Sequence, residues 1–316
     1  MTTRLSWVLV LLVCSTGLDA ARPVLNQELS NLFNEFWRLD THRMTPGVDY
    51  TLSVQGRAGF VNQGSAVVPD HAALPLFSNV NETKFQTITT YARLIRLLDN
   101  FERSTGVAEQ VTADELLEIS QFLDAVLQTP VMRRAHQYLV SKRLSSSDLR
   151  TFKNQLNLIW FQLYRRQRNS QLDSSGFEHV FVGETRSGNE LIGFHNWVQF
   201  YLQEKNLHLD YKGFKAGYRD LPDQDDHVLN LQFTWHSVVK PVGSAFIGTS
   251  PEFEMALYTV VFLLSTERST TVLVNIDQCQ MELVVIRHGR SIETAYPKLL
   301  SSNSRHVRPQ SQPQPH

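Results

Sequence analysis

The spacing of the apolar residues changes once along this chain of 316 residues, near Gly176, and this change limits the folds that it can adopt. Before Gly176, apolar side chains recur every three or four residues, which places them on one face of successive helices. After it, short stretches of alternating apolar and polar residues are typical of strands with one buried face. Helices followed by strands predict an α+β fold, with an N-terminal helical lobe at residues 22–170 and a half of antiparallel sheets with a few helices at residues 171–300.

Local signals mark where individual helices begin. Thr112 and Glu115 have the spacing of a capping box ahead of an apolar stripe. Ser250 followed by Pro251, with acidic residues in the next turn, is typical of a helix start. We therefore expect helices to begin at both places.

Other stretches predict strands and loops. Residues 229–235 alternate as a strand, residues 271–276 and 281–286 are apolar strand candidates, and the apolar residues 179–182 also indicate a strand. Residues 47–80, which are rich in Gly, Pro, Asn and Ser, predict a long loop with short extended pieces.

The two ends of the chain differ in composition from the rest. In residues 1–21, Arg4 precedes an apolar run that ends in small and polar residues, the pattern of a cleavable secretory signal. The run is shorter than the roughly 20 residues that cross a bilayer, so we expect secretion to the extracellular space without a transmembrane anchor. The alternative is an anchored or buried N-terminal helix. Residues 301–316 contain almost no apolar side chains and predict a disordered tail.

Secretion has consequences for the rest of the sequence. Cys14 would leave with the signal and only Cys279 would remain, so no intrachain disulfide is possible and the chain depends on its core. A hydrophobic content of 42% can supply that core. The sequon that begins at Asn81 predicts an exposed N-glycosylation site.

The charge is balanced, which excludes recognition of a polyanion by a global field. Lys and Arg number 30 against 31 Asp and Glu. Any contact with RNA must then come from a local patch, and residues 164–168, Tyr-Arg-Arg-Gln-Arg, are the candidate. Such clusters are more often solvated surface.

The side chains best suited to catalysis are those of His179, His195 and Lys240. One imidazole can take the 2′-OH proton of RNA while another protonates the leaving oxygen, without a catalytic metal. An ammonium group can stabilise the charge that develops on the phosphorus centre. Spacing alone is a weak argument here, because the chain contains 11 histidines.

Four segments resemble the signature blocks of the EndoU endoribonucleases, which include the poly(U)-specific, placental-protein-11-like enzymes and are distantly related to the coronavirus uridylate-specific endonuclease. The blocks occur in the family's order, and the resemblance covers about residues 25–300. The segments are Glu178-His-Val-Phe-Val-Gly-Glu184, Phe194-His-Asn-Trp-Val-Gln-Phe-Tyr201, the stretch from Lys240 to Tyr258 and Thr294-Ala-Tyr-Pro297.

The resemblance implies roles for the matched residues. His179 and His195 match the catalytic histidines and Lys240 the catalytic lysine. We expect His195 to be the base and His179 the acid, although either imidazole is able to reach the 2′-OH. Ser244, Thr294 and Tyr296 match the substrate-binding end of the site, where a hydroxyl contacts the uracil and the tyrosine ring stacks on it. The alternative for Tyr296 is a core residue.

The resemblance also implies manganese, which animal members commonly require. Glu178 and Glu184 offer the oxygen ligands that Mn²⁺ prefers. No cluster of three or more acidic or histidine ligands accompanies them, so we expect a weakly held ion that is shared with the RNA phosphate. The alternative is that both carboxylates orient His179.

The implied activity is that of a secreted, monomeric endoribonuclease for single-stranded, U-rich RNA that leaves 2′,3′-cyclic phosphate and 5′-OH ends. A competing hypothesis is an extracellular RNA-binding protein with the same fold and little turnover, which the pI of about 6.8 and the secretory signal favour. The filled catalytic positions argue against it. A Ser-His-Asp hydrolase is disfavoured because no Gly-x-Ser-x-Gly elbow occurs.

Overall fold

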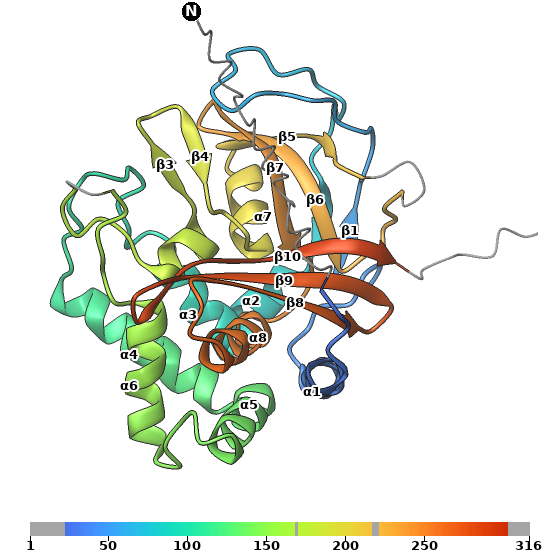
Figure 1. Cartoon of the computed structure of the whole chain (residues 1–316). Coiled ribbons are helices and arrows are strands. Elements are labelled where there is room, and N and C mark those ends of the chain that lie inside the picture. The colour runs from blue at the N-terminus through green and yellow to red at the C-terminus, as the bar shows by residue number, and fades with distance from the viewer. Residues whose placement is uncertain (1–22, 168–169, 217–220, 303–316) are drawn as a thin grey trace, which may run out of the picture.

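The computed structural model describes residues 23–167, 170–216 and 221–302, and most of the helices within them lie apart from the antiparallel sheets (Figure 1). The predicted α+β class is confirmed. The predicted signal at residues 1–21 and nearly all of the predicted tail at residues 301–316 lie outside the described residues. Among those described, no helix combines the length and apolar character that crossing a bilayer requires.

The N-terminal half is mainly helical, as predicted. Its helices are α1 (Gln27–Leu39), α2 (Glu82–Thr87), α3 (Thr89–Leu97), α4 (Ala113–Leu127), α5 (Pro130–Ser141) and α6 (Leu149–Trp160). The capping box that begins α4 forms as expected, because the Thr112 hydroxyl accepts from the backbone of Glu115 and the Glu115 carboxylate accepts from the backbone of Thr112. The loop at residues 47–80 contains two short paired strands, β1 (Tyr50–Leu52) and β2 (Phe77–Val80).

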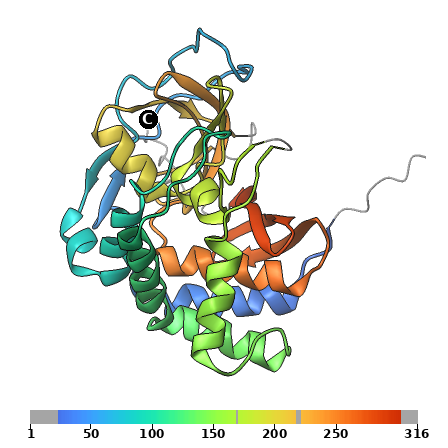
Figure 2. The same ribbon diagram turned by 90° about the vertical axis from the view of Figure 1, so that its left-hand side faces the viewer.

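Helix α8 (Pro251–Leu264) lies at the centre of the molecule. Ser250 caps it and Pro251 occupies its first turn, as predicted. Its first twelve residues are all buried, because α1, α3 and α5 contact it on one side and the later strands β8 (Ser269–Ile276) and β9 (Cys279–His288) on the other. One hydrophobic core therefore joins the helical half to the sheets. In the side view the blue, green and orange helices occupy the lower part of the molecule (Figure 2).

Two three-stranded antiparallel sheets form the other half. One has the order β5-β6-β7, with β5 at Leu209–Phe214, β6 at Val228–Trp235 and β7 at Val238–Phe246. The other has the order β10-β9-β8, with β10 at Ser291–Ser302. The strands predicted at residues 229–235, 271–276 and 281–286 are confirmed. Strand β10 contacts both β6 and β7, so the two sheets meet along it.

The strand predicted at residues 179–182 is wrong. Residues Glu178–Val182 form a single π-helical turn, which the N–H of Gly183 closes by donating to the carbonyl of Glu178 at 2.8 Å. Ser175 and Glu178 bond reciprocally, since each accepts through its side chain from the backbone of the other. Every residue of the turn is buried, so the turn has no exposed polar face and its sequence shows no helical period. The Ser-x-x-Glu spacing of this cap was the signal for a helix start.

Candidate active site

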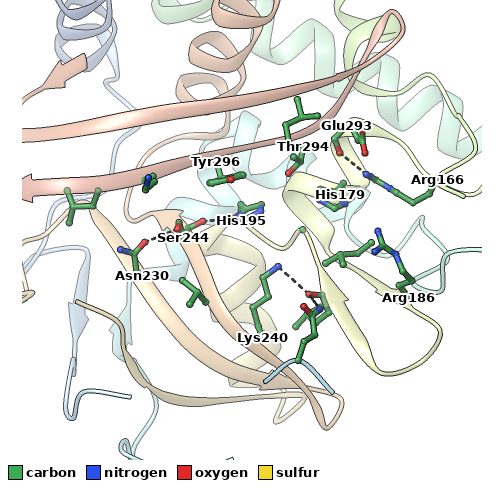
Figure 3. A pocket seen from close by; sticks show the side chains of 18 residues that line it. Arg166, His179, Arg186, His195, Asn230, Lys240, Ser244, Glu293, Thr294 and Tyr296 are labelled. Atoms are coloured by element: carbon green, nitrogen blue, oxygen red, sulfur yellow. Dashed lines mark hydrogen bonds between the residues drawn. The ribbon is translucent and has the colours of Figure 1, made fainter. Parts of the chain in front are cut away.

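A cleft of about 660 Å³ lies where β6 and β7 face β10 (Figure 3). Six of the predicted residues line it: His179, His195, Lys240, Ser244, Thr294 and Tyr296. The small hairpin of β3 (Glu184–Arg186) and β4 (Glu190–Ile192) closes one end. The fold therefore brings into one cleft residues that the sequence spreads over more than a hundred positions.

His179 sits on the π-helical turn, and a carboxylate holds its ring. Its Nδ1 bonds to Glu184 Oε2, which also accepts from Arg166 at 3.0 Å. With Nδ1 engaged, Nε2 is the nitrogen left for a ligand. Burial lowers the pKa of His179 well below its ordinary value, and the positive charges of Arg166 and Lys240 act in the same direction.

His195 lies just before α7 (Trp197–Lys205), which Asn196 caps. Its Nδ1 donates to the carbonyl oxygen of Ser244 at 2.8 Å, and because a carbonyl only accepts, Nδ1 carries the proton and Nε2 presents a lone pair. Burial lowers the pKa of His195 well below its ordinary value, and the Lys240 charge contributes. The imidazole is therefore neutral at pH 7, the state that a base requires.

The two imidazoles lie close enough to act on one phosphodiester. Their ring centroids are 6.4 Å apart. Lys240, on β7, is half-buried and donates through Nζ to the carbonyl of Leu191 at 3.3 Å. Burial lowers the pKa of Lys240 to about 8, so the ammonium is mostly charged at neutral pH and is held with little hydration.

Glu178 is fully buried behind the cleft. Burial, reinforced by the carboxylates of Glu184 and Glu109, raises the pKa of Glu178 well above its ordinary value and so favours the protonated acid. Its reciprocal bonds with Ser175 make it part of the cap that shapes the turn under His179. Of the two predicted carboxylates, Glu184 touches the His179 imidazole and Glu178 supports the backbone.

These carboxylates do not make a manganese cage by themselves. Glu178 and Glu184 each keep one buried oxygen without a hydrogen-bond partner, which is a set of two donor atoms at most, and burial raises the pKa of Glu178. Across the part of the chain that the structure describes, no group of three or more His, Cys, Asp or Glu is placed to hold a metal ion. Mn²⁺ stays a prediction.

The basic cluster at residues 164–168 does not form the predicted surface patch as a whole. The Arg166 side chain is 4% exposed and points inward, where it donates to Ser174 Oγ at 2.9 Å, to the Glu293 carbonyl at 3.0 Å and to Glu184. Arg165 is exposed, whereas Arg168 lies outside the described residues. Arg166 is thus a site residue that we did not predict, since the sequence shows it only as one of several basic residues.

Strand β10 supplies the opposite wall. Tyr296 is half-buried and its ring stacks on His195, with centroids 5.1 Å apart and planes at 20°. Because Tyr296 also lines the cleft, it is not a plain core residue. Thr294 lies two residues earlier and is half-buried in the same cleft.

Asn81 is outside the cleft. It is exposed and precedes α2 as its capping residue. This exposure meets the steric requirement for a glycan.

The family follows from comparison with known proteins. Residues 28–297 match the family model described as Endoribonuclease XendoU, a span that includes every site residue above. The chain is 63% identical over 301 residues to uridylate-specific endoribonuclease C of Danio rerio, covering 95% of this chain and 97% of that protein. It is 55% identical over 284 residues to poly(U)-specific endoribonuclease-A of Xenopus laevis, covering 90% and 97%.

A solved structure agrees with this assignment. It is described as that of XendoU, a splicing-independent snoRNA-processing endoribonuclease, and it matches with a TM-score of 0.80 and 54% identity over 89% of this chain and 100% of that one. The fold and the cleft are thus those of an RNA-cleaving enzyme. The chain belongs to the XendoU family and is an endoribonuclease.

Proposed function

We propose that this enzyme cleaves single-stranded RNA at uridines by attack of the 2′-OH on the adjacent phosphodiester, leaving a 2′,3′-cyclic phosphate and a 5′-OH. The observation that carries the proposal is a pair of buried imidazoles whose ring centroids are 6.4 Å apart, each held through Nδ1 so that Nε2 remains for the substrate. The names of the relatives, uridylate-specific and poly(U)-specific, support uridine as the nucleotide at which the RNA is cleaved.

His195 is the base in this proposal. Its Nε2 lone pair takes the 2′-OH proton, and the 2′-oxygen then forms a bond to phosphorus. The Ser244 carbonyl keeps the donor Nδ1–H in place and stabilises the imidazolium that results. The stacked ring of Tyr296 limits rotation of the imidazole.

His179 is the acid. A bound phosphate favours its protonated form, since a nearby negative charge raises a histidine pKa. Glu184 then faces the imidazolium at Nδ1, while Nε2–H donates its proton to the leaving 5′-oxygen as the P–O bond breaks. Lys240 stabilises the negative charge on the phosphorane oxygens.

The test uses a labelled oligonucleotide with a single ribouridine. His179→Ala and His195→Ala should each lower the cleavage rate by at least about 100-fold, the size of a general acid–base contribution. His208→Ala is the matched control, because His208 is exposed and outside the cleft. Near-full cleavage by both cleft variants, with unchanged circular dichroism, would contradict the proposed machinery.

Product analysis tests the chemistry separately. Mass spectrometry of the 5′ fragment should give the mass of a 2′,3′-cyclic phosphate. A fragment that ends in 3′-OH would rule out attack by the 2′-OH.

We also propose that the chain is secreted as a monomer and carries a glycan on Asn81. The pattern of residues 1–21 and the exposure of Asn81 support this. After expression in animal cells, the medium should contain a protein whose mass falls on treatment with a glycosidase, and Asn81→Gln should abolish that shift. Retention of the chain inside the cells would argue against secretion, and light scattering of the purified protein measures its oligomeric state.

A further inference from the structure

We propose that Asn230 sets the preference for uracil over cytosine by fixing the direction of the Ser244 hydroxyl. This inference rests on the proposed function, in which the base binds at the Ser244 end of the cleft. The resemblance to the family does not assign a role to Asn230.

The two residues are paired by the sheet. Asn230 on β6 is directly opposite Ser244 on β7 in the antiparallel register, so both side chains project to the same face, which is the cleft. Ser244 Oγ donates to Asn230 Oδ1 at 2.8 Å (Figure 3). Ser244 is 8% exposed and Asn230 is half-buried, so a ligand here meets a largely desolvated pair.

The bond decides what the pair offers to a ligand. A serine hydroxyl has one hydrogen, and once Asn230 accepts it, Ser244 Oγ can only accept a further bond. The Asn230 amide nitrogen has no hydrogen-bond partner among the described residues, so its two N–H groups remain for the cleft. The pair therefore presents one acceptor and one donor side by side.

This arrangement matches one edge of uracil. Uracil carries the N3–H donor between two carbonyl oxygens, so Ser244 Oγ accepts from N3–H while Asn230 Nδ2 donates to the carbonyl oxygen at position 4. Cytosine carries a bare N3 acceptor and an amino group at position 4. Cytosine would place its N3 acceptor against the Ser244 acceptor and its amino donor against the Asn230 donor. Unpaired polar groups in a desolvated site are costly.

The same serine also connects base recognition to the chemistry. Its hydroxyl contacts Asn230, whereas its carbonyl holds the Nδ1 of His195 at 2.8 Å. A uracil bound to this hydroxyl thus contacts the same residue whose carbonyl holds His195, the proposed general base.

The experiment compares kcat/KM for two oligonucleotides that differ only in one ribonucleotide, U or C, in an otherwise deoxy strand. Asn230→Ala frees the Ser244 hydroxyl to rotate and donate to N3 of cytosine. The U/C ratio should fall at least about tenfold, since a site that reads polar groups discriminates by such factors. Asn230→Asp still accepts the serine proton but offers an acceptor in place of the donor, so the ratio should fall further, towards cytosine.

Two further variants separate specificity from folding. Asn206→Ala, an exposed asparagine outside the cleft, is the matched control and should keep the wild-type ratio. In a Ser244→Ala background, Asn230→Ala should lower the ratio by a smaller factor than in the wild-type background, because only the direct bond from Asn230 Nδ2 to the uracil is then lost. A merely destabilising change would lower cleavage of U and C together.

An unchanged U/C ratio in both Asn230 variants would overturn the inference. A ratio that rises in Asn230→Ala would overturn it too, since it would mean that the Ser244 hydroxyl hydrogen of the wild type already points at the ligand. Failure of the wild-type enzyme to prefer U over C would instead contradict the proposed function.

Discussion

The backbone of Gly193 lies directly against the carbonyl of His179: a Cβ atom at position 193 would be 1.9 Å from that oxygen. The same carbonyl accepts from the N–H of Phe194 at 2.9 Å, and the next N–H, of His195, donates to the carbonyl of Val180 at 2.8 Å. The two proposed catalytic histidines are thus held together through adjacent backbone contacts. Gly193 also has a φ of +63°, which glycine adopts without strain.

Gly193→Ala should therefore inactivate the enzyme, because the methyl group cannot fit without moving His179. We expect a loss of at least about 100-fold in cleavage rate, as for the loss of an acid or base. Gly188→Ala is the matched control, since Gly188 has a φ of +71° but a Cβ there meets nothing. It should cost about 1 kcal/mol of stability from backbone strain and retain activity. Full activity of Gly193→Ala would show that the contact does not position His179.

The cleavage rate should fall above about pH 8. Lys240 is charged below its pKa, which burial lowers to about 8, and it loses its positive charge as the pH rises through that value. The charge cannot then stabilise the phosphorane. Lys240→Arg stays charged throughout, and the titration of His179 affects both proteins alike, so the ratio of the wild-type rate to the Lys240→Arg rate should fall as the pH rises through about 8. A wild-type rate that holds constant to pH 10 would contradict this role.

Glu184→Gln should lower the rate at saturating Mn²⁺ by about 10- to 100-fold, as for residues that orient a functional imidazole, because Glu184 bonds to Nδ1 of His179. The concentration of Mn²⁺ that gives half-maximal rate should stay the same. Glu267→Gln, at an exposed position, is the control. A raised midpoint for Glu184→Gln alone would instead indicate that this carboxylate is a direct ligand.

Asp40→Asn should make the stability less dependent on pH. Burial, with the neighbouring Glu252, raises the pKa of Asp40 from 3.8 to about 7. The folded state therefore holds this proton more tightly, and stability is lost as the pH rises from about 4 to about 7. Asparagine cannot ionise, and it keeps an oxygen for the N–H of Ser250, which bonds to Asp40 at 3.2 Å.

Urea unfolding at pH 4, 6 and 8 measures the effect. The Asn variant should match the wild type at pH 4 and exceed it at pH 8 by on the order of a few kcal/mol. Glu109 and Glu204, whose pKa values burial also raises to about 7, contribute equally to both proteins and cancel in the difference. A difference that is the same at every pH would contradict the titration of Asp40.

The elements whose signals are local could be predicted from the sequence. The cap between Thr112 and Glu115 and the start of α8 at Ser250 rest on bonds that span three residues, so residue type and spacing suffice to predict them. The two histidines and the lysine were also readable, because their segments keep the motifs of the family. The strand predicted at residues 179–182 was wrong because burial on every side removes the periodicity that distinguishes a helix from a strand.

The assembly of the site depends on how distant segments pack in the folded chain. Arg166 points inward because it bonds to Ser174, Glu184 and Glu293. These partners come from three segments that meet only in the folded chain. The Tyr296 ring reached His195, and Asn230 reached Ser244, through the packing of β10 and the register of β6 on β7. These contacts join residues far apart in sequence, and their geometry is set by the packing of whole elements and leaves no mark in local spacing.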